Sequence, residues 1–201
     1  WHRLPETGAV PIVADMTSDL LCRPIDVGRF GALYAGAQKN VGPAGVTVVV
    51  IRKDLVERAR TDRPAVWQYR SHVQKGSLWN TPPTFAIYML RNTLAVLKEM
   101  GGAPGLEARN REKADLVYDF LDAHPEFFRC PVEKASRSLM NAVFRLPNEA
   151  LEKRFLAEAA DASMIGLQGH RKVGGIRISM YNAVEKAWIE RLLELMRDFR
   201  I

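Results

Sequence analysis

The fold of this chain is decided by the stretch Tyr34-Ala35-Gly36-Ala37-Gln38-Lys39-Asn40-Val41-Gly42-Pro43-Ala44-Gly45. It overlaps the end of one apolar run, residues 31–36, and leads into a β-branched apolar run, residues 46–51. The glycines and the proline between the two runs are typical of a tight turn. The pattern predicts two neighbouring antiparallel strands in a largely buried sheet, and we expect the second strand to be covered on both faces.

A further apolar run, residues 9–14, precedes this stretch and ends at the polar cluster Asp15-Met16-Thr17-Ser18-Asp19. Such a run predicts a buried strand whose carboxyl end meets a polar site. Lys39 follows the run 31–36 in the same way, among small residues that let a large molecule approach the backbone. An acid and a lysine are therefore expected at strand carboxyl ends, where open α/β sheets gather ligand-binding groups.

Beyond the third apolar run the pattern becomes helical. We expect a short helix, a long loop and two longer helices, over residues 53–60, 61–80, 84–100 and 103–123, respectively. A loop of such length usually serves a function or an interface. The expected apolar face of the helix 84–100 consists of residues at helical spacing, namely Ile87, Leu90, Leu94 and Leu97.

From Pro125 onward, strands and helices alternate. We expect strands over residues 140–146 and 172–180 and helices over residues 149–160 and 185–199. This order predicts a small α/β or α+β sandwich. We place a boundary between Met100 and Ala103, which gives a first domain over residues 1–100 and a second domain over residues 101–201.

The composition is that of a globular chain of 201 residues with a formal net charge of +6. Its 29 basic residues are scattered among 23 acidic ones, which favours a solvated surface with a few anion-binding arginines over a nucleic-acid site. Cys22 and Cys130 lack CxxC spacing and favour free thiols in a reducing cytoplasm. We expect no membrane span, because no apolar run approaches roughly 20 residues, and the histidine spacing indicates no metal site.

Asp15 and Lys39 are together the two groups that a pyridoxal phosphate site needs. A lysine in a crowded site can act as a nucleophile toward an aldehyde. An aspartate can keep the pyridine nitrogen protonated, which makes the ring an electron sink. Each residue also has a simpler interpretation, because Lys39 can face water at a strand end and Asp15 can cap a turn or helix.

Five segments resemble the phosphoserine aminotransferase family, a group of class V aminotransferases with the type I pyridoxal phosphate fold. They are residues 13–18 (VADMTS), 23–27 (RPIDV), 34–45 (YAGAQKNVGPAG), 80–85 (NTPPTF) and 169–177 (GHRKVGGIR). The segments keep the family's order, and the similarity extends over essentially the whole chain. The resemblance implies that residues 1–100 are the C-terminal part of a large cofactor-binding domain and that residues 101–201 are the small C-terminal domain.

The resemblance implies roles for five residues around pyridoxal 5'-phosphate. Lys39 binds the cofactor aldehyde and moves the proton during transamination, Asp15 pairs with the pyridine nitrogen, and Gln38 contacts the cofactor. Asn80 and Thr81 reach across a homodimer to the cofactor phosphate of the other subunit, and their neutral donors suit a phosphate. The long loop before them is explained by that reach, although Asn80 and Thr81 also suit an ordinary helix start.

A second set of residues is implied to bind the substrate. Arg177 lies in an alternating strand, where a buried charge must find a partner, and an arginine fork that holds a carboxylate would provide one. The resemblance makes Arg177 the clamp for the substrate α-carboxylate. It makes His170 and Arg171 the pair that helps bind the phosphate of phosphoserine or the side-chain carboxylate of glutamate. Outside this motif, a His-Arg pair would be interpreted as surface residues.

The implied reaction transfers an amino group from L-glutamate to 3-phosphohydroxypyruvate and gives O-phospho-L-serine and 2-oxoglutarate. It belongs to serine biosynthesis and, in bacteria, to pyridoxine biosynthesis. The alternatives are a non-catalytic truncated domain and a class V aminotransferase for another acidic substrate. The chain begins at Trp1, and subunits of the family are longer. We therefore expect a preceding segment to supply the aromatic residue on the ring and the glycine-rich phosphate turn, and the chain alone not to complete the active site.

Overall fold

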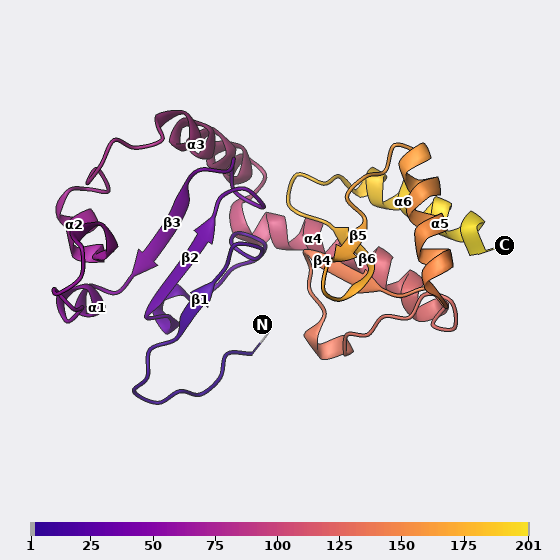
Figure 1. Cartoon of the computed structure of the whole chain (residues 1–201), viewed down its shortest axis with the longest axis horizontal. Helices are drawn as coiled ribbons and strands as arrows, with labels where there is room; N and C mark the ends of the chain where they lie inside the picture. Colours follow the sequence, from indigo (N-terminus) through magenta and orange to yellow (C-terminus); the bar gives the residue numbers. More distant parts are fainter. Residues whose placement is uncertain (1–2, 201) are drawn as a thin grey trace. The chain divides into compact units, whose positions relative to one another are not determined.

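The computed structural model describes residues 3–200, which divide into two compact units. One unit comprises residues 5–102, and the other comprises residues 103–200 together with Arg3 and Leu4. Figure 1 shows the elements of both units in chain order. Each unit has its own sheet of three strands, so the two are described separately.

The first unit is built on the sheet β1-β2-β3, in that order, over Val13–Asp15, Ala32–Gly36 and Thr47–Ile51. Strand β2 pairs antiparallel with β3, which confirms the prediction drawn from the tight turn between them. Strand β1 pairs parallel with β2. The carboxyl ends of β1 and β2 therefore lie at the same edge of the sheet (Figure 1).

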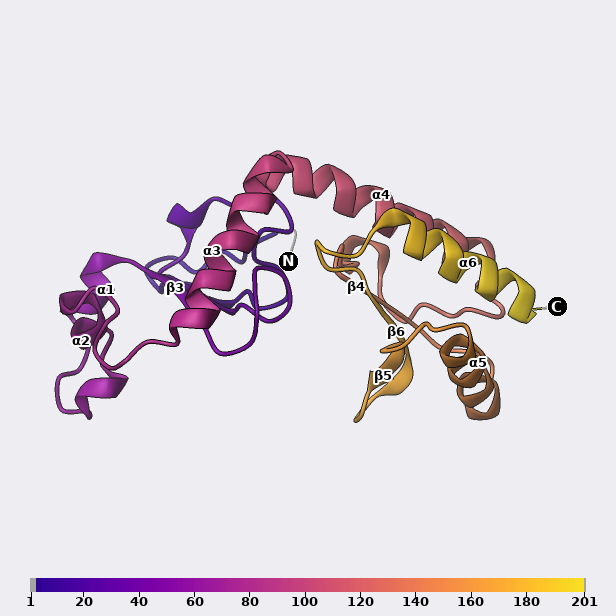
Figure 2. The ribbon, with the colours of Figure 1, turned by 90° about the horizontal axis from the view of Figure 1, so that it is seen from above.

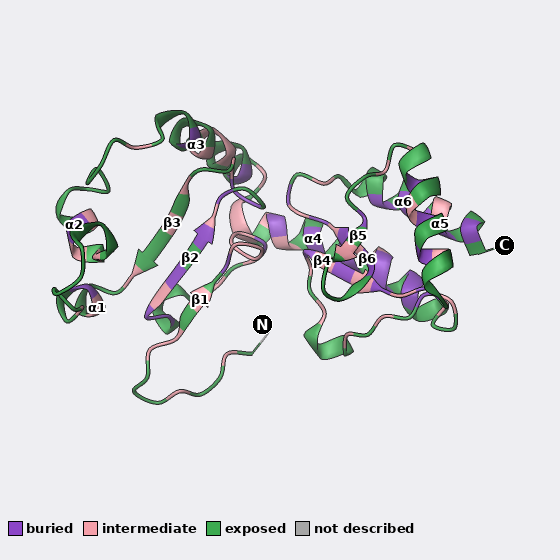
Figure 3. Ribbon diagram, viewed as in Figure 1, coloured by how far each residue is buried: buried purple, intermediate pink, exposed green. Residues whose placement is uncertain are grey.

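Two expectations about this sheet are wrong. The first strand begins at Val13 rather than at residue 9, because residues 7–10 form a turn in which the Val10 amide donates to the Thr7 carbonyl. The third strand is not covered on both faces by the described residues, since Val49 and Val50 keep 38% and 42% of their surface exposed. Figure 3 shows exposed positions along both outer strands. The β-branched run 46–51 therefore predicted a strand correctly and the burial of that strand incorrectly.

The helices of the first unit are α1, α2 and α3, over Lys53–Glu57, Tyr69–Gln74 and Thr84–Glu99. The helix predicted over residues 53–60 thus ends three residues earlier. The segment 61–80 is not a continuous loop, because it contains α2 and a short 3-10 turn over Ala65–Trp67. Helix α2 escaped prediction because it buries a single residue, Ser71, and so shows no apolar periodicity.

Helix α3 has nearly the predicted extent but buries only part of its predicted apolar face. Leu97 is buried as expected, together with Ala86. Ile87 and Leu94 instead remain 41% and 38% exposed. A Cβ added at Gly42 would lie 3.2 Å from Cα of Leu90, so the turn after β2 approaches the backbone of this helix closely.

The second unit has the sheet order β4-β6-β5, with both pairs antiparallel. Its strands β4, β5 and β6 span Asn141–Phe144, Gln168–His170 and Gly174–Ser179. Its helices α4, α5 and α6 span Gly102–Ala123, Glu149–Asp161 and Lys186–Arg200. The helices agree closely with prediction. The strand predicted over residues 172–180 is the second arm of a hairpin, whose first arm, β5, was not predicted.

The helices of the second unit pack on one face of its sheet (Figure 2). Alternate strand residues such as Phe144 and Ile176 enter this core, where they meet Leu121, Phe155 and Met196 from the three helices. Because side chains alternate along a strand, Arg177 and its neighbours in register point to the opposite face. Of the predicted substrate residues, Arg177 therefore lies on the face of the sheet that the helices do not cover, whereas His170 and Arg171 lie at the hairpin turn.

Candidate active site

The predicted cofactor residues lie at the edge where β1 and β2 end. Asp15 is the last residue of β1, and Lys39 lies in the turn that follows β2. Asp15 is in register with Tyr34 of β2. The side chains of Asp15, Gln38 and Lys39 are all exposed, so this edge is open to a ligand within the described part of the chain.

The carboxylate of Asp15 is surrounded by groups that favour its charge. The backbone amide of Thr17 donates to Oδ1 of Asp15 at 2.8 Å. Hydrogen bonds from the Thr17 side chain and backbone, with a smaller contribution from Tyr34 and the charge of Lys39, lower the pKa of Asp15 below its ordinary value. Asp15 is therefore an anion at neutral pH, as a partner for a protonated pyridine nitrogen must be.

Lys39 is oriented by the turn that follows β1. Its Nζ donates a hydrogen bond to Oγ of Ser18 at 2.8 Å. The neighbouring Asn40 is buried, and its Nδ2 donates to the carbonyl of Leu20 at 2.7 Å. The side chains of Lys39 and Asn40 thus tie the turn after β2 to the turn after β1.

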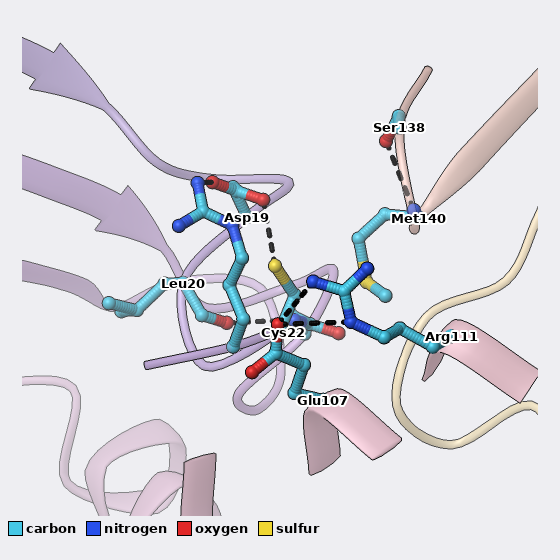
Figure 4. A network of polar contacts seen from close by, with 9 residues as sticks. Asp19, Leu20, Cys22, Glu107, Arg111, Ser138 and Met140 are labelled. Carbon is cyan, nitrogen blue, oxygen red and sulfur yellow. Dashed lines mark hydrogen bonds and ion pairs between the residues drawn. The ribbon is translucent and has the colours of Figure 1, made fainter. Parts of the chain in front are cut away.

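The turn after β1 has its own internal support. The thiol of Cys22 donates to Oδ1 of Asp19 at 2.8 Å (Figure 4). Burial, followed by the contact with Asp19, raises the pKa of the Cys22 thiol. A buried thiol with a raised pKa is a poor nucleophile, so Cys22 is a structural residue of the turn. In the second unit, Arg111 forms an ion pair with Glu107, with 2.7 Å between Nη2 and Oε1. This pair is also drawn in Figure 4.

Gln38 lies against the end of β2. A Cβ added at Gly36 would lie 2.5 Å from Oε1 of Gln38, so only glycine leaves room for this side-chain position. The amide of Gly36 donates to Oγ1 of Thr17 at 3.2 Å. Thr17 therefore connects the ends of β1 and β2, and its hydroxyl also contacts Asp15.

Asn80 and Thr81 are exposed in the connection between α2 and α3. The amide of Asn80 donates to the carbonyl of Thr81 at 3.2 Å. Among the described residues, no hydrogen bond joins either residue to Asp15, Gln38 or Lys39 of the same chain. In Figures 1 and 2, α2 lies beyond the end of the sheet opposite to the carboxyl ends of β1 and β2. The structure therefore does not assemble all five predicted cofactor residues within one chain.

The predicted substrate residues share the β5–β6 hairpin. His170 ends β5, Arg171 follows it in the tight turn, and Arg177 lies within β6. His170 and Arg171 are exposed, whereas Arg177 is half-buried. The Nε of Arg177 is buried and has no hydrogen-bond partner among the described residues. A buried guanidinium donor without a partner is expected where a ligand completes the site.

The groups at the β1–β2 edge fit pyridoxal phosphate chemically. An ionised carboxylate and an accessible primary amine come from adjacent strand ends, and the amine lies close enough for its charge to lower the pKa of the carboxyl. Thr17, Ser18 and Tyr34 complete this edge and were missed by sequence reasoning. Their positions could have identified them, because Thr17 and Ser18 lie two and three residues after Asp15 and Tyr34 is in register with it.

Other kinds of site have little support in residues 3–200. In that range, no helix is long and apolar enough to cross a membrane. Nor do those residues include three or more His, Cys, Asp or Glu side chains grouped to hold a metal ion. Neither Cys22 nor Cys130 forms a disulfide within the described range.

A lysine and an aspartate at neighbouring strand ends are the pair of groups that a pyridoxal-phosphate enzyme uses to hold its cofactor. Residues 2–192 match the family model for aminotransferase class-V. The chain belongs to this family, which confirms the resemblance and the α/β fold inferred from the sequence. Within the family, its relatives include phosphoserine aminotransferases.

The phosphoserine aminotransferase of Lysinibacillus sphaericus (strain C3-41) is 52% identical over 200 residues, which are 100% of this chain and 55% of that protein. The solved phosphoserine aminotransferase from Bacillus circulans subsp. alkalophilus is 47% identical with a TM-score of 0.96, over 99% of this chain and 55% of that one. The phosphoserine aminotransferase from Trichomonas vaginalis, solved with pyridoxal phosphate bound, is 35% identical with a TM-score of 0.91, over 97% and 55%. The chain thus spans about half the length of these relatives.

Proposed function

We propose that this chain is part of a pyridoxal-phosphate-dependent aminotransferase that exchanges L-glutamate and 3-phosphohydroxypyruvate for 2-oxoglutarate and O-phospho-L-serine. The observation that carries the proposal is the placement of Asp15 and Lys39 at one sheet edge, with the charge of Lys39 acting on Asp15. Relatives named phosphoserine aminotransferase, which share 52% of their aligned residues with this chain, support the substrate assignment. The same reaction serves serine biosynthesis and, in bacteria, pyridoxine biosynthesis.

Three residues of the first unit act on the cofactor and the reacting carbon. Pyridoxal phosphate, when bound, supplies a ring that delocalises the electrons of the substrate Cα–H bond. With the cofactor bound, Asp15 would hold the proton on the pyridine nitrogen, Gln38 would contact the ring from the turn, and Lys39 would hold the cofactor carbon until the amino group of the donor takes its place. The Nζ of Lys39, freed by that exchange, would then be the positioned base for the proton on the α-carbon of the amino donor.

The β5–β6 hairpin binds the substrate anions. Arg177 holds the α-carboxylate in two parallel hydrogen bonds, for which its unpartnered Nε provides one donor. His170 and Arg171 bind the phosphate of phosphoserine or the side-chain carboxylate of glutamate. Fixing the substrate at both ends orients the Cα–H bond for removal of its proton.

The remaining assignments concern assembly and location. We assign residues 1–100 to the large cofactor-binding domain and residues 101–201 to the small C-terminal domain. We infer a homodimer in which Asn80 and Thr81 complete the partner's cofactor site, which agrees with the lack of a hydrogen bond from either residue to Asp15, Gln38 or Lys39 among the described residues. We infer a cytoplasmic location, which the small polar substrates of the proposed reaction support.

The test uses the protein expressed from its full-length gene and loaded with pyridoxal phosphate. Glutamate formation from O-phospho-L-serine and 2-oxoglutarate is measured beside the same reaction with L-serine and L-alanine. We expect turnover of phosphoserine in preference to both. Lys39→Ala is expected to abolish it, whereas Lys53→Ala, an exposed lysine at the start of α1, is expected to leave it unchanged. Preference for an unphosphorylated amino acid would overturn the substrate assignment and favour another class V aminotransferase.

The alternative of a non-catalytic domain is tested with the 201-residue chain itself. We predict that it does not turn over phosphoserine, because it spans only 55% of the length of a relative named phosphoserine aminotransferase. Added pyridoxal phosphate is followed by visible absorbance, and the site is located by reduction with borohydride and peptide mass spectrometry. Saturable attachment at Lys39 together with turnover would contradict this prediction.

A further inference from the structure

The β5–β6 hairpin is held from behind by Arg145, the residue that follows β4. The Nη1 of Arg145 donates to the carbonyl of Val173 at 3.2 Å. Val173 belongs to the tight turn of the hairpin, in which its own amide donates to the carbonyl of His170 at 2.8 Å. Arg145 thus bonds directly to the turn that presents His170 and Arg171.

The two glycines after this turn make room for the arginine. A Cβ added at Gly174 would lie 2.6 Å from Nη1 of Arg145, and a Cβ added at Gly175 would lie 2.7 Å from its Cδ. Both glycines have a φ of +75°, which disfavours any other residue. The guanidinium and its stem therefore lie directly on the glycine backbone, and any side chain there would displace them.

Arg145 is itself fixed at two points. Its backbone forms a bridge with Arg129, with N–O distances of 2.9 Å in both directions. Its Nε lies 3.5 Å from Oε1 of Glu152, a buried residue of α5 that also accepts a hydrogen bond from the amide of Leu146 at 3.4 Å. Arg145 therefore connects the hairpin turn to β4 and α5, and so fixes the position of the turn relative to them.

The turn also selects which nitrogen of His170 faces outward. The backbone amide of Lys172 donates to Nδ1 of His170 at 3.2 Å. Because Nδ1 accepts a hydrogen bond, the proton of the neutral ring lies on Nε2. An Nε2–H donor suits a phosphate or carboxylate oxygen, so the conformation of the turn determines whether His170 can bind an anion.

From these contacts we infer that Arg145, supported by Glu152, is a positioning residue for the phosphate-binding pair His170 and Arg171. This inference rests on the proposed function, because it assigns Arg145 to the substrate site that the proposal contains. Arg145 acts through the hairpin backbone and contacts no reacting atom. Its loss is expected to weaken recognition of the substrate phosphate more than it slows the chemical step.

The test compares three variants of the full-length holoenzyme. Arg145→Met removes the contact with Val173, and Arg145→Lys keeps one donor without the planar fork. Arg154→Met is the matched control. Arg154 lies on α5, the helix that carries Glu152, and its Nε lies 3.3 Å from Oε1 of Glu158, so this variant also removes an arginine–glutamate pair. No contact of Arg154 with the hairpin is found among the described residues. Steady-state kinetics with phosphoserine and with serine are combined with hydrogen exchange of the peptide covering residues 168–176.

We expect Arg145→Met to raise KM for phosphoserine about tenfold, the equivalent of one charged hydrogen bond, with less than about a threefold change in kcat. The preference for phosphoserine over serine should fall by a similar factor, Arg145→Lys should restore part of it, and exchange should accelerate in the hairpin. Arg154→Met should change none of these more than about twofold. If Arg145→Met does not fold, Glu152→Gln loosens the arginine more gently and should raise the same KM.

The outcomes separate the inference from the function on which it rests. An unchanged KM and unchanged hairpin exchange in Arg145→Met would overturn the inference, as would an equal loss in Arg154→Met. A wild-type enzyme that does not use phosphoserine would overturn the proposed function. Hydrogen exchange would still show in that case whether Arg145 holds the hairpin, because this measurement needs no substrate.

Discussion

The ammonium of Lys39 donates a hydrogen bond to the hydroxyl of Ser18, with 2.8 Å between Nζ and Oγ. The two residues belong to the turns that follow β2 and β1, so this bond spans the carboxyl ends of two parallel strands. It determines where an otherwise exposed and flexible side chain lies. Under the proposed function, Ser18 therefore positions Lys39 for the aldehyde carbon of pyridoxal phosphate.

Replacement of Ser18 with alanine should slow attachment of pyridoxal phosphate to Lys39. Without the hydroxyl, the lysine samples more rotamers, and loss of one hydrogen bond of about 1 kcal/mol corresponds to roughly a fivefold effect. The rise of visible absorbance after addition of the cofactor to the full-length apoprotein gives the rate. Ser136→Ala, in an exposed turn of the second unit, is the control, and equal rates in the two variants would contradict the role of Ser18.

Thr17 sets the charge of Asp15, and its replacement should change the titration of that residue. Thr17 provides the largest contributions that lower the pKa of Asp15. In Thr17→Ala, the pKa of Asp15 should rise toward its ordinary value, because the hydroxyl donor is lost while the backbone donor remains. Carbon-13 NMR of the aspartate carboxyls follows the titration, with Thr93→Ala as the control, since the Thr93 hydroxyl donates within α3, to the carbonyl of Met89.

The sign of the stability effect follows from the direction of this shift. Because the folded-state pKa of Asp15 is lowered, its ionised form stabilises the fold at pH values above the ordinary aspartate pKa. That contribution is lost as the pH falls through the lowered folded-state value. The difference in urea midpoint between wild type and Thr17→Ala should therefore shrink in acid, and a difference that grows in acid would refute the assignment.

The sequence predicted much of this fold because several segments combine a clear period with clear boundaries. The helix 149–160 has an Asn148 cap whose side chain accepts from the amide of Leu151, and the tight turn before β3 has its glycines and proline. The candidate residues Asp15 and Lys39 could be predicted because both follow apolar runs at the same kind of strand end. Local pattern and tertiary position agree at these places.

Other features depend on contacts that no local pattern contains. Helix α2 buries only Ser71, and the exposed Ile87 and Leu94 of α3 have the same spacing as a buried face. Arg145 lies far from the glycines of the hairpin in sequence, and its role arises from the register of β4 with β6. Such positions can be identified only when strand pairing is known.

Lys113 tests whether a buried charge can hold the second unit together. It is buried in α4, and its Nζ donates to the carbonyls of Met180, Tyr181 and Val184 at 2.9, 3.0 and 2.9 Å. Burial, with a further contribution from Arg109, lowers the pKa of Lys113 to about 8, so at pH 7 it is an ammonium with a carbonyl for each proton. It thereby joins α4 to the turn between β6 and α6.

Lys113→Met should lower the free energy of unfolding at pH 7 by about 2–4 kcal/mol, because three carbonyls lose their donor. Urea denaturation followed by circular dichroism gives this value. Lys153→Met is the control, because Lys153 is exposed on α5, and it should change the stability by less than about 0.5 kcal/mol. A Lys113→Met protein as stable as the control would show that the three bonds contribute nothing net.

In contrast to Lys113, Arg177 should contribute to substrate binding and not to the stability of the substrate-free protein. Its Nε is buried without a partner among the described residues, which costs stability that a bound carboxylate would restore. Arg177→Met should therefore leave the urea midpoint of the substrate-free protein unchanged or raise it. The same variant should raise KM for L-glutamate by roughly a hundredfold, because a two-point charged contact of about 3 kcal/mol is lost.

Two further variants make the Arg177 prediction specific. Arg177→Lys keeps the charge but cannot form two parallel bonds, so it should recover only a small part of the lost affinity. Arg171→Met removes an exposed arginine of the same hairpin and should spare the urea midpoint as well, while it weakens phosphoserine binding in particular. A lower midpoint in Arg177→Met with an unchanged KM for glutamate would mean that Arg177 supports the sheet and not the substrate. The orphaned Nε favours the substrate, since a residue that supported the sheet would have its donors satisfied by the sheet.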